Sequence, residues 1–107
     1  MPVRPMHLIQ FFLPLYDNTG QAFPGTHFEA VRTELTEVFG GVTAFVRAPA
    51  VGVWEDGGGA VQRDDVVLVE VMATQLDHGW WARYRQQLEQ RFAQDEVLVR
   101  AVAIERL

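Results

Sequence analysis

The chain has 107 residues, 49% of them hydrophobic, a formal net charge of −5 and no cysteine. That length suits one domain spanning residues 1–107, and the apolar share is large enough to bury a core. Fourteen acidic against nine basic residues argue against a nucleic-acid-binding surface. The apolar stretch at residues 8–15 is too short for a membrane span and lacks a signal-peptide pattern, so we expect a cytoplasmic protein that does not contact membranes.

The first half of the chain predicts a strand, a helix and a second strand. Residues 7–13 form a short apolar run that ends at Pro14, which cannot donate a backbone hydrogen bond. A Thr-x-x-Glu capping box at Thr26 indicates the start of a helix, and apolar residues recur at helical spacing as far as Phe39. Two glycines follow and stop the helix, and residues 42–48 predict the next strand.

The second half of the chain also predicts a strand, a helix and a strand. A glycine-rich turn at residues 55–59 leads to the clearest strand of the chain, residues 66–74, which has four valines and an alternating pattern. Asp77 can cap a second helix, which keeps its apolar residues on one side as far as Phe92. The last predicted strand covers residues 96–104.

The element order is therefore βαββαβ, which predicts an α+β, ferredoxin-like fold. Right-handed crossovers then give an antiparallel four-stranded sheet in the order 4-1-3-2, with both helices on one face.

Alternation along the strands divides the sheet into two faces. We expect the helix-covered face to carry the apolar set Ile9, Phe11, Leu13, Val42, Ala44, Val46, Val67, Val69, Val71, Val97, Val99 and Ala101. We expect the open face to carry the mixed set Leu8, Gln10, Phe12, Thr43, Phe45, Arg47, Leu68, Glu70, Met72, Leu98, Arg100 and Val102.

The open face predicts a homodimer. A monomer would leave its leucines, phenylalanines and Met72 in water, and large exposed apolar patches usually mark interfaces. Two copies packed sheet on sheet would bury all of these side chains.

With those faces, the architecture resembles the dimeric α+β barrel proteins, in which two ferredoxin-like protomers enclose a cavity. Residues 39–49 (FGGVTAFVRAP) and 64–72 (DDVVLVEVM) also resemble segments of small bacterial proteins of unknown function. The superfamily includes cofactor-independent monooxygenases, haem-degrading enzymes and muconolactone isomerase-like proteins. No motif of this chain selects among them, so the resemblance assigns no catalytic residue.

The candidate ligand-binding residues are the polar side chains of the open face and one tryptophan. Glu70 is expected beside both Gln10 and Arg47, with Arg100 on the far side of Gln10. These residues form either a polar pocket for a small carboxylate or other oxyanion, or an internal Arg–Glu salt bridge. Trp54, before the glycine-rich turn, either contacts a ligand or closes the end of the barrel.

Neither a metal site nor a cofactor site is predicted. The three histidines lack metal-ligand spacing, and the glycine-rich turn lacks the lysine and helix of a phosphate-binding loop. Three functions remain open. The first is a homodimer that binds a small organic molecule, including an anionic one, between its sheets; the second is a monooxygenase or isomerase of the same architecture; the third is an interaction module with a filled interface. The volume between the sheets distinguishes them.

Overall fold

The computed structural model describes residues 4–51 and 63–107, which form four strands and two helices. These elements are β1 (Arg4–Pro14), α1 (Gly25–Phe39), β2 (Ala44–Val51), β3 (Arg63–Ala73), α2 (His78–Arg91) and β4 (Val99–Arg106). The strands form one antiparallel sheet in the order β2-β3-β1-β4. The predicted ferredoxin-like topology, with its 4-1-3-2 order, is confirmed.

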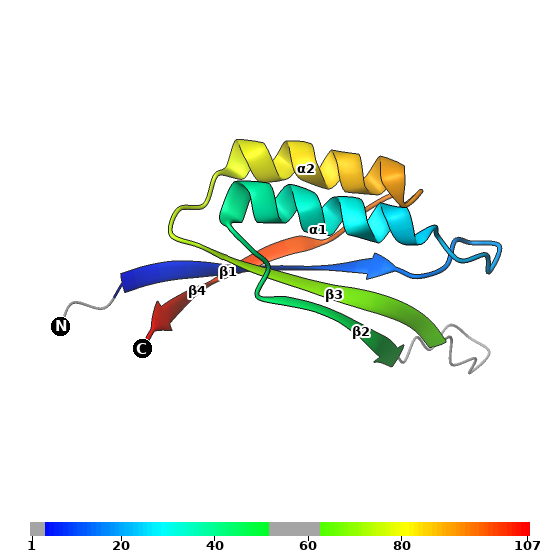
Figure 1. Cartoon of the computed structure of the whole chain (residues 1–107), viewed down its shortest axis with the longest axis horizontal. Coiled ribbons are helices and arrows are strands. Elements are labelled where there is room, and N and C mark those ends of the chain that lie inside the picture. The colour runs from blue at the N-terminus through cyan, green and yellow to red at the C-terminus, as the bar shows by residue number, and fades with distance from the viewer. Residues whose placement is uncertain (1–3, 52–62) are drawn as a thin grey trace.

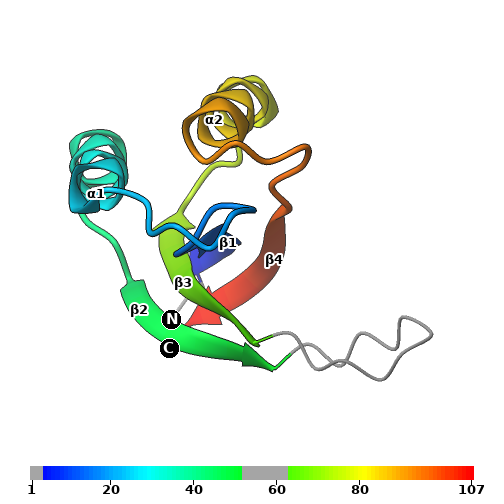
Figure 2. The same cartoon turned by 90° about the vertical axis from the view of Figure 1, so that its right-hand side faces the viewer.

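Both helices lie on the same face of the sheet (Figure 1), and none of the described helices or strands covers the opposite face (Figure 2). The core lies between the helices and the sheet and contains only apolar and aromatic side chains among the described residues. Ile9, Phe11 and Leu13 of β1 and Val69 of β3 are fully buried there, as predicted. Phe11 makes edge-on ring contacts with two aromatic residues of α2, at centroid distances of 6.1 and 6.5 Å.

The two helices begin differently from one another. Asp77 caps α2 as predicted, because its Oδ1 accepts a hydrogen bond of 3.0 Å from the backbone N–H of Trp80. The predicted capping box of α1 is wrong: the N-cap is Pro24, and no side chain caps the helix. The residue following Pro24 is already helical, so Thr26 lies inside the first turn.

The predicted end of α1 is confirmed. Gly40 is the C-cap, with a φ of 78° in the left-handed region, and its N–H donates to the carbonyl oxygen of Thr36 at 2.8 Å. Glycine adopts this conformation without the steric cost that a Cβ brings. In the described residues, neither helix is long and apolar enough to cross a membrane.

The predicted assignment of side chains to the two faces of the sheet is wrong for β2. The register pairs Phe45 with Val69 and Arg47 with Val67, and both valines belong to the helix-covered face. Directly paired residues of an antiparallel sheet share a face, so Phe45 and Arg47 also lie on that face. Val46 points to the open face instead and is half exposed.

The reason for this difference is the packing of α1 against the edge of the sheet. The Phe45 ring packs against the core, and the guanidinium carbon of Arg32 lies 4.7 Å from its centroid. A phenylalanine buries more apolar area than an alanine or a valine, so the larger ring takes the covered side. The two faces of β2 are both partly apolar, and alternation alone could not decide between them.

Candidate functional site

A row of three polar side chains crosses the middle of the open face. The register pairs Gln10 of β1 with Glu70 of β3 on one side and with Arg100 of β4 on the other. Directly paired residues of antiparallel strands point to the same side of a sheet, so the three side chains lie next to one another. The predicted neighbourhood of Gln10 with Glu70 and Arg100 is therefore confirmed.

Gln10 links the two charged groups through its amide. Its Nε2 donates to Oε2 of Glu70 at 3.0 Å, and its Oε1 accepts from Nε of Arg100 at 3.3 Å. The amide N–H group donates to the carboxylate and the amide oxygen accepts from the guanidinium, so both polar groups of the Gln10 amide are hydrogen-bonded. The contact between the carboxylate and the guanidinium is relayed by Gln10 and is not the direct salt bridge that we considered from the sequence.

Apolar side chains surround this polar row. Four large ones on the same face are between 39% and 51% exposed: Phe12, Val46, Met72 and Val102. Leu98, which lies just before β4 and has the same parity as Arg100, is 60% exposed. The Arg100 guanidinium carbon lies 5.9 Å from the centroid of the Phe12 ring, at the outer limit of a cation–π contact. The open face therefore combines an aromatic ring, a carboxylate, an amide and a guanidinium within an apolar surface.

One of the predicted ligand-binding residues, Arg47, is not part of this row. Arg47 belongs to the helix-covered side of the edge strand β2, for the reason given above, so the expected contact of Glu70 with Arg47 is wrong. Glu70 is instead paired with Ala44. Trp54 lies outside the described residues.

A second group of polar side chains links the two helices, and sequence reasoning missed it. The carboxylate of Glu34 on α1 accepts two hydrogen bonds from Arg91 of α2, at 2.8 and 2.9 Å, and one from the hydroxyl of Tyr84 at 3.0 Å. Polar residues of amphipathic helices usually face solvent, so the sequence carries no signal that these three residues meet.

These contacts shift the ionisation of all three groups. Hydrogen bonds from Arg91 lower the pKa of Glu34, and the carboxylate in turn raises the pKa of Arg91. Burial is the main cause that raises the pKa of Tyr84, and the negative charge of Glu34 adds to it. At neutral pH the cluster is therefore an ionised pair with a neutral phenol, which suits a structural clamp.

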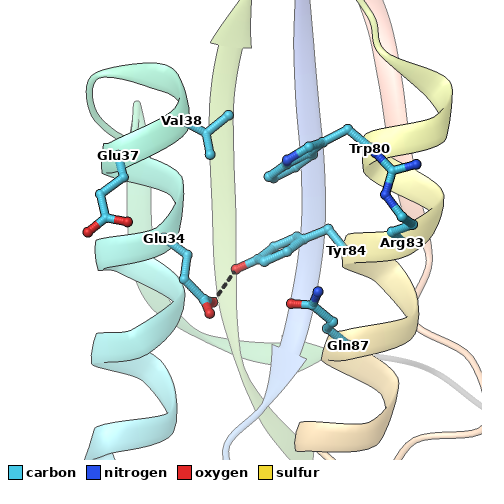
Figure 3. A pocket seen from close by; sticks show the side chains of 7 residues that line it. All are labelled: Glu34, Glu37, Val38, Trp80, Arg83, Tyr84 and Gln87. Carbon is cyan, nitrogen blue, oxygen red and sulfur yellow. Dashed lines mark hydrogen bonds between the residues drawn. The ribbon is translucent and has the colours of Figure 1, made fainter.

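A cleft of about 220 Å³ lies beside this clamp (Figure 3). Tyr84 projects from α2 toward Glu34 on α1, and Trp80, one turn above it, projects toward Val38 at the upper rim. The Trp80 and Tyr84 rings are stacked, with centroids 4.9 Å apart. The cleft is smaller than most small-molecule sites, and its carboxylate is already occupied by Arg91 and Tyr84.

In residues 4–51 and 63–107, no three histidine, aspartate or glutamate side chains gather in a way that could hold a metal ion. His27 packs against the rings of Phe23 and Phe92, with centroids 6.1 and 5.9 Å away. His78 is exposed in the first turn of α2.

The comparisons with known proteins concern the fold alone. No family model and no curated protein sequence matches the chain. Among solved structures, a phage SAM lyase in complex with S-methyl-5'-thioadenosine is similar to it, with a TM-score of 0.62 and 14% sequence identity over 94% of this chain and 90% of that chain. The chain therefore shares its fold with a protein solved with a small ligand.

Proposed function

We propose that this protein forms a homodimer through its open sheet face and binds a small organic molecule between the facing sheets. The observation that supports the proposal is the hydrogen-bonded row of Glu70, Gln10 and Arg100 on a face that is otherwise apolar and exposed. Burying one of the large apolar side chains on this face is worth roughly 1.5–3 kcal/mol. Five half-exposed side chains of this kind together favour a partner for the face.

The polar row narrows the class of ligand. From the sequence we expected two arginines, which favours a carboxylate or other oxyanion. With Arg47 on the other face, one guanidinium and one carboxylate are left, so a ligand with both donors and acceptors fits better than a simple anion. An aromatic or aliphatic portion of the ligand could pack on Phe12 and the neighbouring apolar side chains.

The structural neighbour suggests a first probe. S-Methyl-5'-thioadenosine, present in the complex of the phage SAM lyase, has ribose hydroxyls, a purine ring and an apolar thioether. Such a molecule combines the groups that the row and its surroundings would accept. The proposal is limited to binding, because an amide, a carboxylate and a guanidinium bonded to one another do not form a catalytic set.

The first experiment measures the mass of the purified protein by light scattering at several micromolar concentrations. We expect twice the chain mass of 12.1 kDa. Phe12→Arg should lower the measured mass, because a buried unpaired guanidinium is costly in a dimer interface. Val38→Arg is the matched control, since Val38 is an exposed apolar residue of α1 on the helical side. A monomeric wild-type protein would refute the homodimer.

The second experiment measures ligand binding by calorimetry and by thermal shift. The probes are S-methyl-5'-thioadenosine and, as an aromatic anion, benzoate. A ligand at about a hundred times its dissociation constant stabilises the folded state by about 2.7 kcal/mol, which gives a clear shift. Glu70→Leu should abolish the shift, and Glu29→Leu on the exposed side of α1 should leave it intact. A stable dimer that binds neither probe and has a filled interface would favour the interaction module instead.

A further inference from the structure

We propose that the symmetry axis of the assembly runs along β1, so that Glu70 of one copy faces the partner's Arg100. This arrangement rests on the self-association through the open face proposed above. It adds the relative orientation of the copies, and it makes any site between the sheets composite, with a carboxylate from one copy and a guanidinium from the other.

The polar row has a direction, because its two ends carry opposite charges. Glu70 on β3 forms the negative end and Arg100 on β4 forms the positive end, while Gln10 on the central strand β1 lies between them. Neighbouring strands lie about 4.8 Å apart, so the backbones that carry the two charges are about 10 Å apart. The row is thus a short dipole across the strands.

Both ends of the row retain unused hydrogen-bonding capacity. Glu70 accepts from Gln10 through Oε2, and Arg100 donates to Gln10 through Nε. Among the described residues, Oε1 of Glu70 and the two terminal guanidinium nitrogens of Arg100 have no hydrogen-bond partner. In a face-to-face assembly these atoms leave bulk water, and buried charged groups must then be paired.

The direction of the symmetry axis decides which charges meet. An axis along β1 reverses the order of the strands from one copy to the other, so the negative end of each row lies over the positive end of the partner's row. An axis across the strands keeps their order, so Glu70 faces Glu70 and Arg100 faces Arg100. Sheets that cross at about 90° bring the rows together only at Gln10.

Only the axis along β1 satisfies both charges. It brings the acceptor Oε1 of each Glu70 toward the terminal nitrogens of the partner's Arg100, so that the two groups can hydrogen-bond to each other or to a ligand held between them. The axis across the strands places like charges opposite each other in an interface, which strongly disfavours that arrangement.

Cross-linking tests the arrangement directly. The chain has no cysteine, so an introduced thiol is unique. Facing sheets pack about 10 Å apart, within the reach of a short bis-maleimide. Glu70→Cys and Arg100→Cys proteins, mixed after brief unfolding and refolding, should cross-link to each other efficiently. Each variant alone should cross-link poorly, while Gln10→Cys should cross-link to itself.

A charge exchange provides a second measurement. Glu70→Arg alone and Arg100→Glu alone should each weaken self-association roughly tenfold or more, because each creates like-charged pairs at both ends of the row. An equimolar mixture of the two variants should restore it, since every facing pair is again opposite in charge. Restoration also shows that both variants fold. Glu29→Arg and Arg83→Glu, on the exposed surface of the helices, are the charge-matched controls.

The outcomes separate this arrangement from the proposed function. Efficient cross-linking of Glu70→Cys to itself, or unchanged self-association in both charge variants, would overturn the axis along β1 and leave the homodimer standing. A wild-type protein that stays monomeric would overturn both.

Discussion

Replacing Glu34 by alanine should destabilise the protein by about 2 kcal/mol. The ion pair with Arg91 is partly exposed, with 21% and 35% of the two side chains accessible, so it contributes no more than about 1 kcal/mol. The larger contribution comes from the hydroxyl of Tyr84, a residue that is only 4% exposed and would lose its acceptor. A buried donor without a partner costs about 1–3 kcal/mol.

Urea unfolding at a fixed protein concentration, followed by tryptophan fluorescence, measures this cost as a free energy. A thermal melt is the second measurement: for a domain of this size 1 kcal/mol corresponds to roughly 4–8 °C, so the melting temperature should fall by about 10 °C. Glu37→Ala is the matched control, because it makes the same change on an exposed position of the same helix and carries the same gain in helix propensity.

A double-mutant cycle isolates the contribution of the hydroxyl. In the Tyr84→Phe background there is no buried hydroxyl to leave without an acceptor and only the partly exposed pair with Arg91 is lost, so Glu34→Ala should cost about 1 kcal/mol or less. If Glu34→Ala costs the same in both backgrounds, or no more than Glu37→Ala, then the clamp does not link the helices in the way described.

The other predictions concern pH and the helix ends. The folded pKa of Glu34 lies below its ordinary value of 4.5, so the ionised carboxylate stabilises the folded state fully above pH 4.5. This contribution is lost as the pH falls through the folded pKa. The difference in unfolding free energy between wild type and Glu34→Gln should therefore close over that pH range. A Cβ would meet open space at both Gly40 and Gly25, but Gly40 has a φ of 78° and Gly25 has no positive φ, so Gly40→Ala should cost about 1–2 kcal/mol in urea unfolding and Gly25→Ala clearly less. Asp77→Ala should cost about 1 kcal/mol in the same assay and Thr26→Ala almost nothing, and equal costs would contradict the helix starts observed here.

The topology and all three residues of the polar row could be predicted from the sequence. In β1 and β3 the alternation is strong: Ile9, Phe11 and Leu13 are apolar on one side, and Gln10 interrupts the other. The same parity in β3 and β4 brings Glu70 and Arg100 to the face of Gln10. Strand order and parity together were therefore enough to place three of the four polar candidates on the sheet.

Two features could not be predicted, for different physical reasons. The orientation of β2 depends on whether α1 covers Phe45 or the smaller side chains on either side of it, and this is decided by packing that strand alternation does not record. The Glu34–Arg91 pair joins residues 57 positions apart on two helices. It depends on how the helices are rotated over the sheet, and no local pattern encodes that rotation.

The position of β1 in the sheet has a consequence for how the protein is made. β1 is synthesised before the other strands, yet it is one of the two inner strands of the sheet, and the hydrogen bond from Arg100 to Gln10 joins residues 90 positions apart. On the ribosome, the backbone groups of β1 that pair with β4 therefore have no strand partner until translation of the domain is almost complete. Emerging chains with such an edge are natural clients of chaperones that shield hydrophobic strands.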